Sequence, residues 1–237
     1  MAKEKRNYLS GREVKAIAKA NAKEMKRLEA YKNRKAKEEE FLTEMRDDSN
    51  ILEIDDLHTF FFTEQGVVKA VNGVSYDVPR NAVVGIVGES GCGKSVTSLS
   101  LMQLLQRPQG QIVSGEIRLN LGDKAYDITK TPNEKMQNIR GNHVSMIFQE
   151  PMRAFSPVHT IGNQINEATL LHITKDKEKA KKITLDMMKL VGIERAEERS
   201  RLYPYNFSGG MRQRSVMAMA LASNPRILFA DEPTTAL

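Results

Sequence analysis

The sequence predicts an α/β fold, and two short apolar runs carry most of that prediction. The runs AVVGIV, at 82–87, and ILFA, at 227–230, contain no charged or polar side chain, as expected of strands buried on both faces. A glycine-rich turn and the helical stretch VTSLSLMQLLQ follow the first run. Two longer β-branched stretches, at 51–62 and 67–78, predict further strands ahead of it.

Length and composition allow one domain of ordinary size with an appendage. The 237 residues are 40% hydrophobic, which is enough to bury a core, and the net charge of +6 does not by itself indicate nucleic acid. The single cysteine, Cys92, excludes an internal disulfide and fits a reducing compartment. No apolar run is long enough to span a bilayer, and no apolar secretory signal begins the sequence. We therefore expect a cytosolic chain that reaches any membrane through a partner.

Residues 1–50 predict a basic helical extension. Residues 1–37 hold 13 Lys and Arg against 4 Glu, and the first 48 residues contain no Pro and one Gly, which favours helix. The simplest interpretation is a solvated helix. A more specific interpretation is a basic arm that binds anionic lipid or a partner. Nucleic-acid binding is less favoured, because aromatic residues do not alternate with the charges.

The stretch GESGCGKS, at 88–95, follows the first apolar run and precedes a helix. The pattern G-x-x-x-x-G-K-[ST] in this setting predicts a phosphate-binding loop rather than a chance glycine-rich turn. Gly88, Gly91 and Gly93 let backbone N–H groups converge on an anion, and the helix N-terminus adds the positive end of its dipole.

Two side chains complete the predicted loop. Lys94 is expected to reach the β- and γ-phosphates as a point charge, and the Ser95 hydroxyl to bind Mg²⁺. Cys92 fills a variable position of the motif, where we expect a spectator or else an alkylatable thiol.

The stretch HVSMIFQEPM, at 143–152, predicts an apolar strand that ends in Gln149 and Glu150 and is stopped by Pro151. An amide at a strand tip can bind a metal and orient a water without carrying charge. Taken alone, the pattern would favour an ordinary polar strand end.

A second anion site is predicted where Ser208, Gly209 and Gly210 open a long helix that runs to 224. Ser is a natural N-cap, and the two glycines expose backbone N–H groups at the positive end of the helix dipole. An ordinary capped helix is the alternative. Two phosphate sites on one chain make sense if two copies meet head to tail and each caps the nucleotide bound by the other.

The second apolar run ends in two acids, Asp231 and Glu232. At a strand tip, Asp231 is expected to hold Mg²⁺, and Glu232 to polarise the water that attacks a γ-phosphate. The upstream phosphate-binding loop favours this interpretation over two acids in an ordinary turn.

Together these segments resemble an ABC-type ATPase over about residues 51–237. GESGCGKS resembles its Walker A motif, Gln149 its Q-loop residue, FSGGM its signature motif and ILFADE its Walker B strand with the catalytic glutamate. In detail, GIVGESGCGKS, IFQEPM, YPYNFSGGMRQR and DEPTTAL resemble the ATP-binding subunits of oligopeptide and dipeptide importers.

The resemblance implies a P-loop NTPase fold of ABC ATPase type, with an N-terminal antiparallel β part and a helical subdomain at about 151–222. Phe61 would stack on adenine, with Phe60 and Phe62 as competitors. Gln149 and Glu232 would be catalytic, and Ser95, Gln149 and Asp231 would hold Mg²⁺. The implied nucleotide-binding residues are Phe61, Gly88, Glu89, Ser90, Gly91, Cys92, Gly93, Lys94, Ser95, Ser208, Gly209 and Gly210.

The implied function is ATP binding and hydrolysis that energise an importer of oligopeptides, dipeptides or related solutes. The implied partners are a second ABC ATPase subunit, two transmembrane permease subunits and, indirectly, an extracytoplasmic solute-binding protein. No nucleic acid is expected. The chain would lie peripherally at the cytoplasmic face of the cell membrane.

The sequence stops soon after the Walker B acids, where the family continues with further strands and a switch histidine. We therefore expect an ATPase domain that is truncated after Walker B and lacks its C-terminal strands. Two alternatives remain open at this point: an inactive ABC ATPase fragment, and a soluble ABC ATPase without a membrane partner.

Overall fold

The computed structural model describes residues 10–149 and 154–233. The chain divides into two compact units, one up to Met136 and one from Gln137 onwards. Helix α3 (Asn133–Ile139) runs across this boundary. No helix of the described residues is long and apolar enough to cross a membrane.

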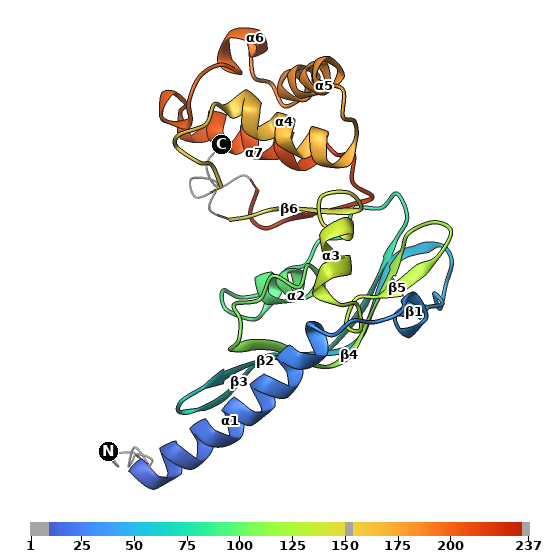
Figure 1. Cartoon of the computed structure of the whole chain (residues 1–237), viewed down its shortest axis with the longest axis vertical. Helices are drawn as coiled ribbons and strands as arrows, with labels where there is room; N and C mark the ends of the chain where they lie inside the picture. Colours follow the sequence, from blue (N-terminus) through green and yellow to red (C-terminus); the bar gives the residue numbers. More distant parts are fainter. Residues whose placement is uncertain (1–9, 150–153, 234–237) are drawn as a thin grey trace. The chain divides into compact units, whose positions relative to one another are not determined.

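The first unit is built on a five-stranded antiparallel sheet (Figure 1). Its strand order is β1-β5-β4-β2-β3, so the two longest strands pair as a hairpin at one edge. The strands predicted at 51–62 and 67–78 are confirmed as β2 and β3. The bounds are β1 (Leu42–Thr43), β2 (Asn50–Thr63), β3 (Gly66–Pro79), β4 (Gly110–Asn120) and β5 (Ala125–Asp127).

Helix α1 (Gly11–Lys32) packs across β2, β3 and β4 and confirms the helix predicted in the N-terminal extension (Figure 1). Ser10 caps its N-terminus, with a capping box to Glu13. Asn21 is buried against the β2–β3 turn and donates to the carbonyls of Thr63 and Gly66 at 2.8 and 3.3 Å. A short 3-10 helix, η1 (Glu38–Glu40), follows before β1.

The predicted strand at 82–87 is wrong: this segment has no strand conformation and pairs with no strand of the described residues. Val83 and Val87 are almost fully exposed, at 102% and 93%. A short strand buried on both faces is stable only between hydrogen-bonded neighbours. The helix predicted after the glycine-rich loop is confirmed but shorter, as α2 (Lys94–Leu101).

The second unit consists of helices and a two-stranded parallel sheet, β6–β7. The strand predicted at 227–230 is confirmed with the same bounds, and the strand predicted from 143 is confirmed as β6. The end of that stretch, 150–152, lies outside the described residues. The bounds are β6 (Val144–Ile147), α4 (Ile161–His172), α5 (Lys177–Leu190), α6 (Ala196–Arg199), η3 (Pro204–Asn206), α7 (Gly209–Leu221) and β7 (Ile227–Ala230).

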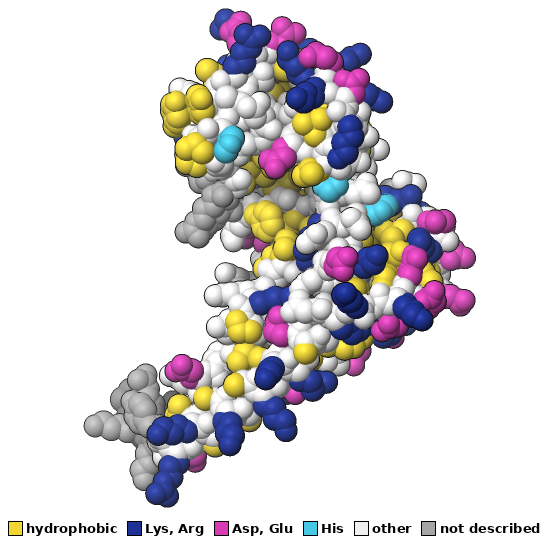
Figure 2. Space-filling model, viewed as in Figure 1, with side chains coloured by type: hydrophobic (Ala, Val, Ile, Leu, Met, Phe, Trp, Pro, Cys, Tyr) yellow, Lys and Arg dark blue, Asp and Glu magenta, His cyan; other side chains and the backbone are white. Residues whose placement is uncertain are grey.

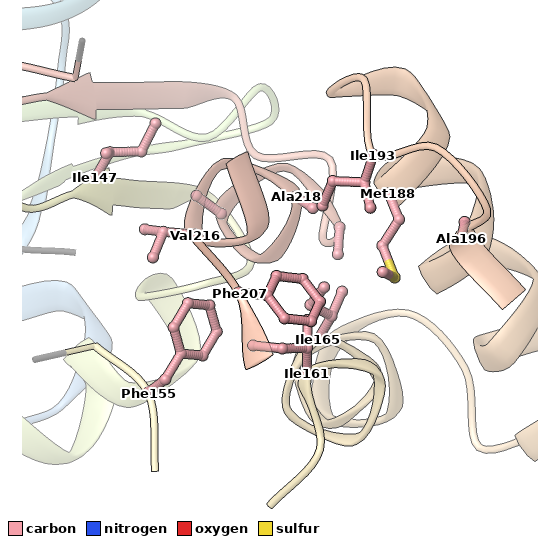
Figure 3. Packing of buried hydrophobic residues seen from close by; sticks show 12 residues of the cluster. Ile147, Phe155, Ile161, Ile165, Met188, Ile193, Ala196, Phe207, Val216 and Ala218 are labelled. Atoms are coloured by element: carbon pink, nitrogen blue, oxygen red, sulfur yellow. The ribbon is translucent and has the colours of Figure 1, made fainter. Parts of the chain in front are cut away.

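One apolar core joins the helices of the second unit to β6 (Figure 3). Ile161 and Ile165 of α4, Met188 of α5 and Ala218 of α7 are fully buried in it. Phe207, which directly precedes the start of α7, is 3% exposed and points into the same cluster. The apolar core therefore fixes where α7 begins.

Candidate functional site

The glycine-rich loop of the first unit has the backbone of an anion-binding turn. Gly91 and Gly93 have φ values of 81° and 101°, in the left-handed region that favours glycine. Gly93 is also the N-cap of α2, and a Cβ atom there would lie 2.4 Å from the carbonyl oxygen of Ala70. The loop can therefore reach the helix by this path only with glycine at position 93.

The Lys94 side chain folds back over its own loop. Its Nζ donates to the carbonyls of Gly88 and Glu89 at 2.7 and 2.8 Å. The ammonium group therefore lies above the loop, where a bound anion would also meet the N-terminus of α2. Ser95, in the first turn of α2, is half-buried.

The variable positions of the loop, Glu89, Ser90 and Cys92, are exposed. The Cys92 Sγ lies 3.9 Å from the Lys94 Nζ, and Cys92 is a free thiol. A Cβ atom at Gly88 would lie 2.7 Å from the Cys92 Sγ, so this thiol lies against the start of the loop.

The three phenylalanines of β2 have different surroundings. Phe62 is 7% exposed and belongs to the core. Phe61 is half-buried and lies against Gly110, where a Cβ atom would come within 2.9 Å of its ring. Phe60, also half-buried, makes an edge contact with His58, and the Lys69 ammonium lies 5.5 Å from its ring centre. Burial leaves Phe61 and Phe60 as the aromatic candidates for an exposed stacking contact.

In the second unit the parallel pairing of β6 and β7 brings two predicted catalytic residues together. Ile147 of β6 lies opposite Ala230 of β7, and the Asp231 N–H extends the ladder by donating to the Ile147 carbonyl at 3.0 Å. Just beyond, the Gln149 Nε2 donates to the Glu232 Oε2 at 2.8 Å. Glu232 has a φ of 48°, an uncommon backbone conformation for a non-glycine residue.

The other predicted anion site lies at the start of α7. Ser208 caps the helix, and its Oγ accepts from the Met211 N–H at 3.3 Å. Gly209 is exposed, and a Cβ atom there would meet nothing within 4 Å. The Met211 N–H is thus bonded to the cap, whereas the turn is open to solvent at Gly209.

Comparison with known families shows to which family the chain belongs. A family model described as ABC transporter matches residues 71–235. The chain belongs to the ABC transporter family. The matched residues include the glycine-rich loop and the β7 tip, which we call the Walker A loop and the Walker B tip after the motifs that they resemble.

Curated members of this family have closely similar sequences. The oligopeptide transport ATP-binding protein AppD of Bacillus subtilis is 47% identical over 189 residues, which are 80% of this chain and 56% of AppD. The dipeptide transport ATP-binding protein DppD of the same organism is 49% identical over 187 residues, 79% of this chain and 55% of DppD. The predicted resemblance to these subunits is confirmed. The chain spans about half the length of the curated relatives it matches.

The structure resembles solved ABC cassettes. The ATP-binding cassette MJ0796, in a dimeric post-hydrolysis state bound to ADP and Pi, matches with a TM-score of 0.68 and 23% identity. The match covers 78% of this chain and 75% of that one. The predicted α/β fold of ABC ATPase type is confirmed.

The chemistry of the polar groups in this ABC-family chain fits Mg²⁺. Because Gln149 uses its Nε2 to hold Glu232, its Oε1 points elsewhere and can serve as a neutral oxygen ligand. Asp231, a half-buried residue of the same unit, has a carboxylate, and Ser95 of the first unit separately offers a hydroxyl. Such oxygen donors suit a hard divalent cation.

Gln213 of α7 is a buried polar residue that the sequence motifs did not predict. It is fully buried, and its Nε2 donates at 2.6 Å to the carbonyl of Pro233, the residue after Glu232. Its Oε1 is buried and has no hydrogen-bond partner among the described residues. The next residue, Arg214, donates to the Gly192 carbonyl at 2.9 Å. In the sequence Gln213 stands between Arg212 and Arg214, and this charged setting gives no signal of its burial.

Proposed function

We propose that the chain is the ATP-binding and ATP-hydrolysing part of an ABC importer for oligopeptides, dipeptides or related solutes. Its similarity to AppD and DppD supports the solute class. One contact carries the proposed chemistry: the 2.8 Å hydrogen bond from Gln149 to Glu232 at the tips of two parallel strands. A polar residue and an acid held together at that position suit the orientation of a water for attack on a γ-phosphate.

The Walker A loop would bind the phosphates. Its backbone N–H groups and the N-terminus of α2 face the anion, with Gly88, Gly91 and Gly93 allowing the turn. Lys94 would exchange its two carbonyl contacts for charge-assisted hydrogen bonds to phosphate oxygens, which are stronger. Phe61 would stack on the adenine ring.

Glu232 would act as the general base, and Gln149 would orient its carboxylate. When bound, Mg²⁺ would neutralise phosphate charge, and Ser95, Gln149 and Asp231 supply oxygen ligands of the kind it prefers. Glu232 has no place in that ligand set and would act on the water instead.

Two ATPase subunits would work as a pair. Ser208, Gly209 and Gly210 would contact the nucleotide held by the partner subunit, whether a second copy or a related chain. The helical subdomain at about 151–222 would contact two transmembrane permease subunits at the cytoplasmic face of the membrane. An extracytoplasmic solute-binding protein would act indirectly, and no nucleic acid is involved.

The test uses two substitutions in the assembled transporter. Glu232→Gln should keep ATP binding and abolish turnover, because the amide cannot take up a proton. Lys94→Ala should abolish nucleotide binding itself. Hydrolysis at the normal rate by the Glu232→Gln protein would exclude the proposed base. ATPase activity without co-purifying permease would instead favour a soluble ABC ATPase.

One observation favours a second candidate, a chain that binds nucleotide without turnover. The segment 82–87, which leads into the Walker A loop, is exposed and forms no strand. Such a chain would bind a fluorescent ATP analogue through Lys94, and its turnover would be zero both before and after the Glu232→Gln substitution.

A further inference from the structure

Helix α1 carries a row of cations on the side that faces away from the sheet. Figure 2 shows Lys and Arg side chains gathered along this helix. Five of them follow one another at spacings of three and four residues, and all five are exposed. The row consists of Arg12, Lys15, Lys19, Lys23 and Lys26. At 100° per residue these positions fall within an arc of about 80° and along about 21 Å of the helix axis.

The opposite side of α1 is fixed to the first unit. Asn21, Leu28 and Lys32 are buried there. The Lys32 Nζ donates to the Thr129 carbonyl at 2.5 Å, and burial lowers the pKa of Lys32 to about 7. The Gln111 Nε2 of β4 donates to Glu29 at 2.6 Å. The helix is therefore a docked, straight ridge, and the cation row is its outer edge.

The acids of α1 form their hydrogen bonds and ion pairs with groups outside this row, and only Glu24 also lies in the field of one of its members, Lys23. Glu13 accepts from the N–H and the hydroxyl of Ser10, both at 2.7 Å, in the capping box. Glu24 pairs with Arg27, and Glu29 faces Gln111 and Arg107 of the first unit. The five cations of the row form no ion pair with any described residue. Five positive charges are thus held in line and left to solvent.

We propose that this cation row binds the anionic lipid headgroups of a membrane surface. A row of four or more basic residues on one face of a helix suits a flat anionic surface, which a straight docked ridge can meet along its whole length. Between residues 12 and 26 no other side chain falls within the arc, and its nearest neighbours on either side are Ala16 and Ala22. Nothing therefore inserts between lipids, and the attraction is electrostatic and salt-sensitive.

The observations favour lipid over a polynucleotide. No aromatic side chain lies in the arc to stack on bases. Tyr31 lies outside it, with the Arg34 guanidinium 3.8 Å above its ring. The preference for a membrane also rests on the proposed function, which places the chain beside one. Helix α1 precedes the part that the family model matches, so this surface is separate from the ATPase motifs.

Vesicle flotation of the full chain tests the row without requiring ATP turnover. We expect binding to vesicles of phosphatidylcholine with phosphatidylserine, little binding to phosphatidylcholine alone, and loss of binding as salt rises. The triple change Lys15→Gln, Lys19→Gln and Lys23→Gln should lower the partition coefficient roughly 100-fold, since each basic residue near an anionic surface contributes about fivefold.

The matched control removes the same charge from another exposed helix, by Lys177→Gln, Lys181→Gln and Lys182→Gln in α5. It should bind the vesicles like the unchanged chain, and both triple variants should keep the thermal stability of the unchanged chain. Equal vesicle binding by the two variants would overturn the inference. So would tighter binding to single-stranded RNA than to the anionic vesicles at the same salt concentration. Because flotation needs no hydrolysis, a failed ATPase assay leaves this result standing.

Discussion

The approach to the Walker A loop and the approach to the Walker B acids consist of similar residues and have different structures. Residues 82–87 are a run of Ala, Val, Ile and Gly that is exposed and unpaired within the described residues. Residues 227–230, equally apolar, form β7 and pair in parallel with β6 along their whole length. An apolar run becomes a strand only when a neighbouring strand accepts its backbone hydrogen bonds.

The functional groups that follow these two runs depend on their surroundings to different degrees. The Walker A loop keeps its turn because Gly91 and Gly93 set it locally and α2 begins directly after it. The contact between Gln149 and Glu232 exists only because β6 and β7 lie side by side. The loop is therefore local structure, whereas the acid–amide pair is tertiary structure.

The largest expected effect comes from breaking the local turn with Gly93→Ala. The new Cβ atom would sit 2.4 Å from the Ala70 carbonyl oxygen at a φ of 101°. We expect the free energy of unfolding to fall by about 3 kcal/mol and nucleotide binding to be lost. Thermal unfolding and titration with a fluorescent ATP analogue would measure both.

Gly91→Ala is the matched control for that change. Gly91 also has a positive φ, 81°, but a Cβ atom there meets nothing within 4 Å. Only the backbone cost of about 1 to 2 kcal/mol should remain. If the two alanine variants lost the same stability, the close approach of Ala70 would not be what requires glycine at 93.

A smaller effect is expected where the tertiary pair is anchored, at Gln213. Gln213→Met removes the bond to the Pro233 carbonyl, which costs about 1 kcal/mol, but also removes a buried acceptor without a partner. Stability should therefore change little, while turnover should fall roughly tenfold, about 1.4 kcal/mol, as the turn after Glu232 loosens. Steady-state ATPase kinetics should show the loss in kcat rather than in KM.

Arg214→Met serves as the comparison for Gln213. It removes a neighbouring anchor of the same helix, the 2.9 Å bond to the Gly192 carbonyl, which does not involve the Walker B turn. Its kcat should stay near that of the unchanged protein. A similar fall in kcat for both variants would mean that α7 matters only as a packed helix.

The difference between local and tertiary structure also explains which features the sequence could predict. Gly93, Lys94 and Ser208 act within their own turn or cap, so their motifs predicted the local structure around them. The bounds of β7 followed from its apolar run and the acids after it. Gln213 was missed because its partner, Pro233, is 20 residues away, and burial on α7 is not visible in the spacing of a motif. The segment 82–87 was predicted wrongly because its pattern contains no information about a neighbouring strand.

The last expected effect is the loss of one helix cap at Ser208, where local structure and proposed function coincide. Ser208→Ala removes the cap of α7 and should cost about 1 kcal/mol. Thr160→Ala removes a cap with the same 3.3 Å geometry from α4 in the same unit, and should cost a similar amount. The proposal that Ser208 meets the partner's nucleotide requires the two variants to differ in ATPase rate, with only Ser208→Ala impaired. Equal ATPase rates in the two variants, at equal stability, would mean that Ser208 is only a helix cap. The loss of a cap by itself affects both helices alike.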